Sequence, residues 1–257
     1  MSARPPSSVL PRLFELYRKH AQVEIVSGLN PYHFGNYRDA PFTRFVKNGS
    51  DLTNHLGISM WEVLMLQDFC AALEPRSLFI VGNGLGWSAL ALSLINPTAR
   101  VLAIDPENGI ELTNRIAQAE GLDCRAVRGW SPDDTRRVID EYGGKGPPDL
   151  VLIDGLHDTL AVIRDFCAAF EVSGEGACYL FHDVVNFGLE PAMASISSIA
   201  GRCGMRTAVL AATPSGMAAV YPLQASEAFL SVLNVYQGSH DCLKLVAKEA
   251  NSSAFSA

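Results

Sequence analysis

An apolar run that leads directly into alternating glycines places the strongest constraint on this chain. Leu78 to Val81 is followed by Gly82, Gly84 and Gly86, and then by an apolar segment that begins at Trp87. The pattern predicts a buried strand, a turn too tight for side chains, and a helix. Glycines let backbone N–H groups approach a ligand closely, and the helix N-terminus adds partial positive charge. The segment therefore predicts a nucleotide-binding turn, with a ligand-free strand-to-helix turn as the alternative.

A second apolar strand, near residues 101–105, ends in the carboxylate of Asp105. An acid at this strand tip can accept hydrogen bonds from both hydroxyls of a ribose, so its position supports a nucleotide site. A third short strand, near 124–128, ends in Gly129, Trp130 and Ser131. These residues are expected to line an adenine, with Trp130 or Ser131 against its edge; the alternative is an ordinary loop whose tryptophan packs on a neighbouring helix.

Strands and helices alternate through the middle of the chain. The apolar periodicity predicts strands near 77–81, 101–105, 124–128, 149–153 and 177–182, with helices near 87–95, 110–120, 132–141, 158–170 and 189–202. Two final strands, 205–212 and 217–221, flank a turn at 213–216, which indicates a hairpin. We therefore predict an α/β fold: a doubly wound, mostly parallel, seven-stranded Rossmann-like sheet with an antiparallel last strand and helices on both faces.

The two ends of the chain predict additions to this sheet. Apolar spacing predicts an amphipathic helix from Leu10 to about Ser27, and the aromatic-rich segment 28–54 reads either as a substrate lid or as packing under a loop. A further helix is expected over 62–73 and a terminal helix over 225–247. The predicted organisation is residues 1–54 as N-terminal helix and lid, 55–222 as the Rossmann-like domain, and 223–257 as C-terminal helix and tail.

Composition excludes several classes of partner. The chain has 257 residues and a net charge of −7, and its isoelectric point is about 5.3, which opposes nucleic-acid binding because such proteins rely on Lys and Arg. No stretch resembles a membrane span and the N-terminus lacks a signal-peptide core, so a cytoplasmic protein is expected. The six cysteines show no C-x-x-C spacing, which favours reduced core thiols.

Acids and histidines follow two strands at the same expected edge of the sheet. The fourth strand ends in Asp154, with His157 three residues later, and the fifth ends in His182 and Asp183. Ligands of open α/β sheets bind beyond the carboxyl ends of the strands, so these residues are expected to share a site with the glycine turn and Asp105. The other histidines stand alone and are interpreted as surface or packing residues: His20, His33, His55 and His240.

With these features, residues 55–222 resemble the class I S-adenosylmethionine-dependent methyltransferases, most closely the small-molecule O-methyltransferases of the catechol and macrolide-sugar type. The resemblance implies S-adenosylmethionine as cofactor, a small-molecule acceptor, Asp154 and Asp183 as Mg²⁺ ligands, and His157 as general base. The sequence leaves the oligomeric state open, with a homo-oligomer as one alternative. The implied cofactor-binding residues are Gly82, Asn83, Gly84, Gly86, Ser88, Asp105, Gly129, Trp130, Ser131 and Asp154.

Two positions depart from that family. Ile80 stands where the family usually has an acid, two residues before the first glycine. The family's third metal ligand is commonly Asn after the second acid or Glu before it, and here Val184 and His182 occupy those places.

Methyl transfer is an in-line displacement, so the protein mainly orients the two substrates and removes the acceptor's proton. A divalent cation would assist by lowering the pKa of the acceptor hydroxyl. The candidate ligands are Asp154, Asp183 and His182; the histidine is a poor ligand for Mg²⁺ but is acceptable for a softer metal. Without a metal, His157 or His182 would act as the base, oriented by one of the two acids.

Two other functions fit part of the pattern. Residues 84–89 also match the dinucleotide fingerprint G-x-G-x-x-A, with Asp105 about 20 residues further on, which is typical of NAD(P)-dependent oxidoreductases. The late hairpin, the Asp and His pairs, and the lack of a Tyr-x-x-x-Lys pair favour the methyltransferase. Ile80 also leaves open a non-catalytic nucleotide-binding module of the same fold.

Overall fold

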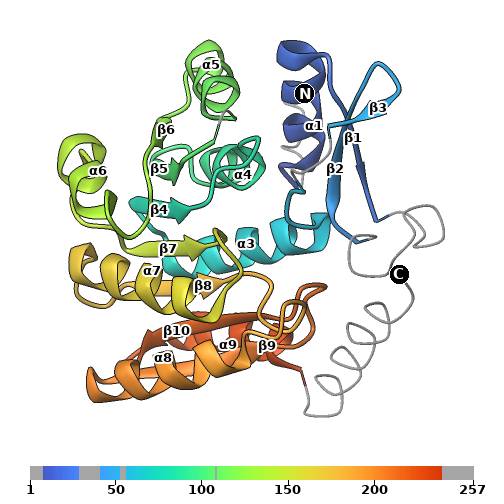
Figure 1. Cartoon of the computed structure of the whole chain (residues 1–257). Coiled ribbons are helices and arrows are strands. Elements are labelled where there is room, and N and C mark those ends of the chain that lie inside the picture. The colour runs from blue at the N-terminus through green and yellow to red at the C-terminus, as the bar shows by residue number, and fades with distance from the viewer. Residues whose placement is uncertain (1–7, 29–40, 53–55, 108, 239–257) are drawn as a thin grey trace, which may run out of the picture.

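A seven-stranded sheet forms the centre of the protein (Figure 1). The computed structural model describes residues 8–28, 41–52, 56–107 and 109–238. The strand order is β6-β5-β4-β7-β8-β10-β9, and β10 runs antiparallel to both of its neighbours. The strands are β4 (Ser77–Val81), β5 (Arg100–Asp105), β6 (Cys124–Arg128), β7 (Leu150–Ile153), β8 (Cys178–Phe181), β9 (Met205–Leu210) and β10 (Met217–Pro222). The predicted fold class is confirmed.

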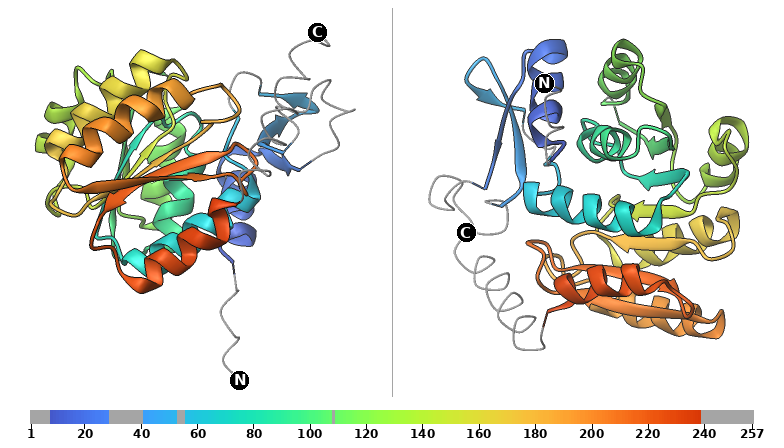
Figure 2. Two further views of the ribbon diagram at one scale, coloured as in Figure 1. Left: turned by 90° about the horizontal axis from the view of Figure 1, so that it is seen from below. Right: turned by 180° about the vertical axis from the view of Figure 1, so that it is seen from behind.

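Helices cover both faces of this sheet, as Figure 2 shows. One face packs against α1 (Leu10–Ala21), α3 (Met60–Leu73), α4 (Trp87–Ile95), α5 (Ile110–Glu120) and α9 (Glu227–Gln237). The other face packs against α6 (Thr135–Tyr142), α7 (Thr159–Val172) and α8 (Glu190–Arg202). Among the described helices, none is both long enough and apolar enough to cross a bilayer.

The reversal in strand order lies at β4, the strand that precedes the glycines. Its side chains alternate between the two cores, with Ile80 on one face and Phe79 on the other, and all its residues are buried. β4 pairs in parallel with β5 on one side and with β7 on the other. β5 and β7 thus lie on opposite sides of β4, in opposite halves of the sheet. At such a reversal of strand order, the loops at the carboxyl ends of the strands leave room for a ligand.

The N-terminal region differs from the sequence-based expectation. The helix predicted to reach Ser27 ends at Ala21, where Gln22 adopts a left-handed conformation (φ 55°), and the chain continues as β1 (Glu24–Ser27). The segment expected to be irregular contributes β2 (Thr43–Lys47) and β3 (Ser50–Asp51).

These three strands form a separate antiparallel sheet in the order β1-β2-β3. The β-branched residues Ile25 and Val26 suit a strand because branched side chains fit a pleated surface. Residues 29–40 of the predicted lid lie outside the described residues, as do residues 239–247 of the predicted terminal helix.

The first helix packs against the glycine-containing turn. Tyr17 is fully buried, and its ring lies against Phe45 and Trp87. Its hydroxyl donates a hydrogen bond of 2.8 Å to the backbone carbonyl of Leu85. The N-terminal helix therefore helps to fix the turn that follows β4.

Candidate functional site

The turn Gly82–Gly86, here called the glycine turn, needs glycine at defined positions. Gly82 has φ 96°, and a Cβ atom there would lie 2.0 Å from the backbone oxygen of Asp154. Gly86 has φ 87°, and a Cβ atom would lie 2.2 Å from Oγ1 of Thr113. At these positions any side chain would have to displace a neighbouring strand tip or helix. The turn is therefore built for close approach of backbone to backbone.

Asp105 holds the glycine turn from the adjacent strand. Its Oδ2 accepts hydrogen bonds from the backbone N–H groups of Asn83 (2.6 Å) and Gly84 (3.0 Å), and its Oδ1 accepts one from Glu107 (2.7 Å). The residue is 8 % exposed. The carboxylate is thus already positioned by three N–H donors, and its remaining lone pairs face the pocket.

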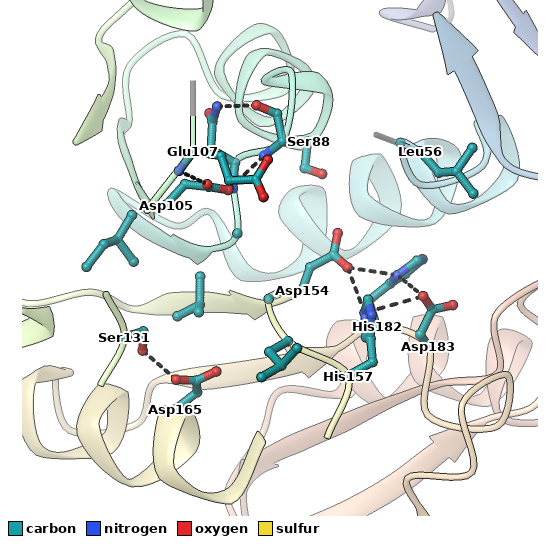
Figure 3. A pocket seen from close by; sticks show the side chains of 18 of the residues that line it. Leu56, Ser88, Asp105, Glu107, Ser131, Asp154, His157, Asp165, His182 and Asp183 are labelled. Atoms are coloured by element: carbon teal, nitrogen blue, oxygen red, sulfur yellow. Dashed lines mark hydrogen bonds and ion pairs between the residues drawn. The ribbon is translucent and has the colours of Figure 1, made fainter. Parts of the chain in front are cut away.

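One pocket of about 590 Å³ extends from the glycine turn to the tips of β7 and β8. Figure 3 shows Asp105 on one side of this pocket and Asp154, His157, His182 and Asp183 on another. The predicted site residues that line it are Gly82, Asn83, Gly84, Ser88, Asp105, Gly129, Trp130, Ser131, Asp154, His157, His182 and Asp183. Gly86, the remaining predicted residue, is the N-cap of α4.

A polar pair, of which Asp165 is buried and Ser131 partly buried, lies at the end of the pocket predicted for adenine. The hydroxyl of Ser131 donates to Oδ1 of Asp165 at 2.6 Å, and Asp165 extends from α7. Burial raises the pKa of Asp165, and the hydrogen bond from Ser131 offsets part of that rise. Trp130 is 65 % exposed and lines the pocket, so it is not packed into the core.

Asp154, His157, His182 and Asp183 form the His–Asp cluster. One potential ligand atom from each of the four lies within 4.8 Å of the others. Nδ1 of His182 is 2.9 Å from Oδ1 of Asp154 and 3.4 Å from Oδ2 of Asp183. Nε2 of His157 is 3.5 Å and 3.3 Å from the same two oxygens. The tips of two adjacent strands thus bring together all four residues singled out in the sequence.

The two nitrogens that face this cluster make no hydrogen bond with any described residue, although both atoms are buried. A buried nitrogen without a hydrogen bond is costly unless another group satisfies it. Carboxylate oxygens and imidazole nitrogens are also the donors that bind divalent transition metals. The residues therefore fit a cation between them.

Charge within the cluster shifts the ionisation of its members. Burial opposes the charged form of His182, but the carboxylates of Asp154, Asp183 and Glu62 outweigh it and raise the pKa of His182 well above its usual value. Burial likewise opposes ionisation of Asp154, and the attraction of the two histidines lowers its pKa despite that cost. Asp154 is thus suited to bind a positive group near neutral pH.

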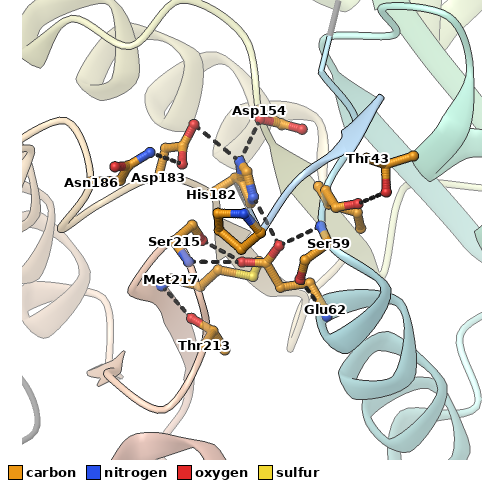
Figure 4. A network of polar contacts seen from close by, with 12 residues as sticks. Thr43, Ser59, Glu62, Asp154, His182, Asp183, Asn186, Thr213, Ser215 and Met217 are labelled. Atoms are coloured by element: carbon orange, nitrogen blue, oxygen red, sulfur yellow. Dashed lines mark hydrogen bonds and ion pairs between the residues drawn. The ribbon is translucent and has the colours of Figure 1, made fainter. Parts of the chain in front are cut away.

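Glu62 lies behind His182 and is fully buried (Figure 4). Its Oε2 is 3.3 Å from Nε2 of His182 and accepts from the N–H of Ser59 at 2.8 Å. Its Oε1 accepts from the N–H of Ser215 at 3.1 Å and from its hydroxyl at 2.6 Å. Burial opposes ionisation of Glu62, but His182 outweighs it and the net effect lowers the pKa of Glu62. The glutamate therefore fixes the orientation of the histidine ring.

Asp183 adopts a backbone conformation that is unusual for a residue with a side chain. Its φ is 58°, in the left-handed region. Nδ2 of Asn186 donates to its Oδ1 at 3.1 Å, while its Oδ2 faces the two histidines. Strained residues of this kind often occur at functional sites, where the surrounding structure maintains them.

Several pocket residues were not identified from the sequence. The pattern Ser59-x-x-Glu62 indicates a capping box at the start of α3, and the structure has one. Glu62 also contacts His182, and this contact could not be predicted because the two residues are 120 positions apart in the sequence. Asp165 occupies an ordinary position within a helix pattern and carried no signal. The apolar residues Leu56, Leu156 and Phe187 line the pocket from loops, where periodicity gives no information.

The strand order, with an antiparallel hairpin at the β9 edge and a glycine turn after β4, defines the Rossmann-like methyltransferase fold. Residues 80–184 match the model of a family described as a methyltransferase domain. The match within residues 80–184, together with the fold, confirms the resemblance to the class I S-adenosylmethionine-dependent methyltransferases. No curated protein matches the chain by sequence.

Solved structures share this fold at low sequence identity. The O-methyltransferase TomG from Streptomyces achromogenes, involved in tomaymycin synthesis and solved with S-adenosylmethionine, is 14 % identical with a TM-score of 0.55. The match covers 86 % of this chain and 92 % of TomG. An O-methyltransferase from Bacillus cereus, solved with S-adenosylhomocysteine, is 17 % identical with a TM-score of 0.55, over 66 % of this chain and 84 % of that one.

Proposed function

We propose that the protein transfers a methyl group from S-adenosylmethionine to a hydroxyl of a small molecule. One observation carries this proposal: a single pocket connects the glycine turn and Asp105 with the His–Asp cluster. A methyl donor at the first end and an acceptor at the second would meet inside this one pocket. Structural neighbours that are O-methyltransferases solved with the donor or its demethylated product support the same assignment.

The donor half of the pocket is formed by the glycine turn, Asp105 and the Ser131–Asp165 pair. Asp105 would accept hydrogen bonds from ribose hydroxyls, and the Ser131–Asp165 pair offers an acceptor for an exocyclic amino group. Ile80 is fully buried within the core, so no carboxylate enters the pocket from that position of β4. Donor binding therefore depends on β5 and on the loops after β4 and β6.

The acceptor half has an apolar rim. Leu56, Leu156 and Phe187 line it and are 43 %, 70 % and 40 % exposed, although they are large apolar side chains. Phe42 and Phe45 from the N-terminal segment also line the pocket. We propose that residues 1–54 form one wall of the acceptor site and that the acceptor has an apolar or aromatic body, which would cover these side chains.

The acceptor's proton would pass to His157. Its side chain is 25 % exposed, whereas that of His182 is 5 % exposed and held by Glu62, so His157 is the more accessible of the two histidines that line the pocket. Its ring stacks on Phe187 with 4.5 Å between centroids, which fixes the plane of the imidazole. A divalent cation held by the His–Asp cluster would supply Lewis-acid assistance by lowering the pKa of the acceptor hydroxyl.

The negative net charge and the pocket support a small molecule rather than nucleic acid as partner. A cytoplasmic location stays a prediction from the sequence, and a homo-oligomer stays one alternative.

The test combines donor binding with turnover. Calorimetry should detect binding of S-adenosylmethionine and S-adenosylhomocysteine but not of NAD(P)H, and a panel of catechols, other phenols and sugar hydroxyls should reveal S-adenosylhomocysteine formation. His157→Ala should lower kcat by about 10²- to 10⁴-fold with donor affinity nearly unchanged. His20→Ala, at a histidine outside the pocket, is the matched control. Binding of NAD(P)H in place of the sulfonium donor would contradict the proposal.

A further inference from the structure

The His–Asp cluster contains a histidine nitrogen whose environment specifies the kind of cation it would accept. Nε2 of His182 faces the buried carboxylate of Glu62, which can only accept a hydrogen bond, so this nitrogen carries the proton. The ring's other nitrogen, Nδ1, then faces Asp154 and Asp183. Proteins commonly orient a histidine ligand of a metal in this way: one ring nitrogen donates to a carboxylate, and the other ring nitrogen faces the metal site. Here the second nitrogen faces a group of acids.

A protonated His182 that bridges acids on both sides is the alternative explanation. Nδ1 lies 2.9 Å from Oδ1 of Asp154 but makes no hydrogen bond of good geometry with any described residue, so the second proton that the three surrounding acids favour on this ring would be poorly held there, and a cation could replace it. The side chain is 5 % exposed, so water cannot readily compensate. The same holds for Nε2 of His157, a buried atom that also lacks a hydrogen bond to the described residues. Two nitrogens and two carboxylate oxygens thus lie around a common centre, all within 4.8 Å of one another.

From this geometry, and resting on the proposed function, we infer that the cation site is selective for a first-row transition metal over Mg²⁺. Asp154, Asp183 and Nδ1 of His182 are its protein ligands, and Glu62 is the positioning residue for His182. Mg²⁺ prefers an all-oxygen set, whereas an imidazole ligand suits Fe²⁺ and Zn²⁺, and Mn²⁺ accepts an imidazole beside its carboxylate ligands. Three protein ligands leave a position open toward the pocket, beside His157, as in catalytic metal sites.

The inference also explains Glu62 itself. Each carboxylate oxygen of Glu62 already accepts a hydrogen bond from a serine, Ser59 or Ser215, so the acid does not need a histidine to satisfy it. Its remaining contact is nevertheless with His182, which is 120 positions away in the sequence. The contact joins α3, β8 and the turn between β9 and β10, so the ring of His182 is fixed from three elements. A ligand fixed in this way loses little freedom when it binds a metal.

The experiment measures metal binding without substrate, so it is independent of methyl transfer. Protein freed of metal by dialysis against a chelator is titrated with Mn²⁺, followed by electron paramagnetic resonance, and then competed with Mg²⁺. We expect at least tenfold tighter binding of Mn²⁺ than of Mg²⁺, and a pulsed resonance spectrum of the bound Mn²⁺ that shows coupling to a histidine nitrogen. Equal affinities, no binding of Mn²⁺, or bound Mn²⁺ without nitrogen coupling would each overturn the inference.

Variants then separate the ligand from its positioning residue. Glu62→Gln should weaken Mn²⁺ binding by about 10- to 100-fold, as loss of such a partner does in other metal sites, and should keep the nitrogen coupling. His182→Gln should abolish that coupling. Asp158→Asn is the matched control, because Asp158 lies four residues from Asp154 but only caps α7. Unchanged Mn²⁺ affinity in folded Glu62→Gln would contradict the positioning role. If the wild-type protein shows the expected metal binding but methylates no acceptor, the proposed function alone fails.

Discussion

Replacement of Asp105 by alanine should destabilise the protein even without a ligand, because this carboxylate holds the glycine turn. The change removes the acceptor for three backbone N–H groups, at 2.6, 3.0 and 2.7 Å. A hydrogen bond to a charged group contributes about 1.5–3 kcal/mol, but the freed N–H groups border an open pocket and water can reach them. We therefore expect a loss of about 2–4 kcal/mol in the free energy of unfolding.

Urea unfolding of the ligand-free protein gives this value, and a thermal melt should show a lower Tm, since about 2–4 °C corresponds to each kcal/mol in a chain of this size. Calorimetry with S-adenosylhomocysteine then measures the added loss of binding, about 1.5–3 kcal/mol for the ribose contact. Glu111→Gln, which alters an exposed acid on α5, is the matched control and should change stability by less than about 0.5 kcal/mol.

A urea midpoint and slope equal to those of the parent protein in folded Asp105→Ala would refute this stabilising role of the carboxylate. In that case the three hydrogen bonds do not stabilise the turn, and Asp105 would act on the ligand alone. Unchanged ligand affinity combined with reduced stability would instead remove Asp105 from the donor site and leave it a purely structural acid.

Three further predictions concern other parts of the fold. Gly82→Ala should cost about 3 kcal/mol or more, because φ is 96° and a Cβ atom would lie 2.0 Å from a carbonyl oxygen, whereas Gly84→Ala has open space and should cost about 1 kcal/mol; urea unfolding compares the two. Tyr17→Phe should weaken donor binding in calorimetry by roughly 1 kcal/mol through loss of its hydrogen bond to the glycine turn. Hydrogen bonds, first that from Lys19, lower the pKa of Glu120 from 4.5 to about 2, so its contribution is present above pH 4.5 and is lost as the pH falls toward 2. Glu120→Gln should cost about 1 kcal/mol at pH 7, and urea unfolding should show this difference shrinking below pH 4.5.

The sheet and its ligand edge could be predicted from the sequence because they rest on local patterns. Alternating apolar segments separated by turn residues give the strands, and strand tips place Asp105, Asp154 and Asp183 on one edge. The role of Glu62 could not be predicted in this way, because it depends on a contact between α3 and β8. Local propensity also misled at the N-terminus, where pairing of β1 with β2 determines the structure of residues 24–27.

The contact of α1 with the glycine turn limits how this chain can exchange parts with its relatives. A boundary near residue 54 suggests a separable N-terminal module, yet Tyr17 binds the carbonyl of Leu85, and Arg12, Lys19 and His20 all pair with Glu120 of α5. The same segment supplies Phe42 and Phe45 to the pocket wall. A chimaera that replaces residues 1–54 to change the acceptor would therefore also alter the donor half, so recombination at this boundary requires matching substitutions on α4 and α5.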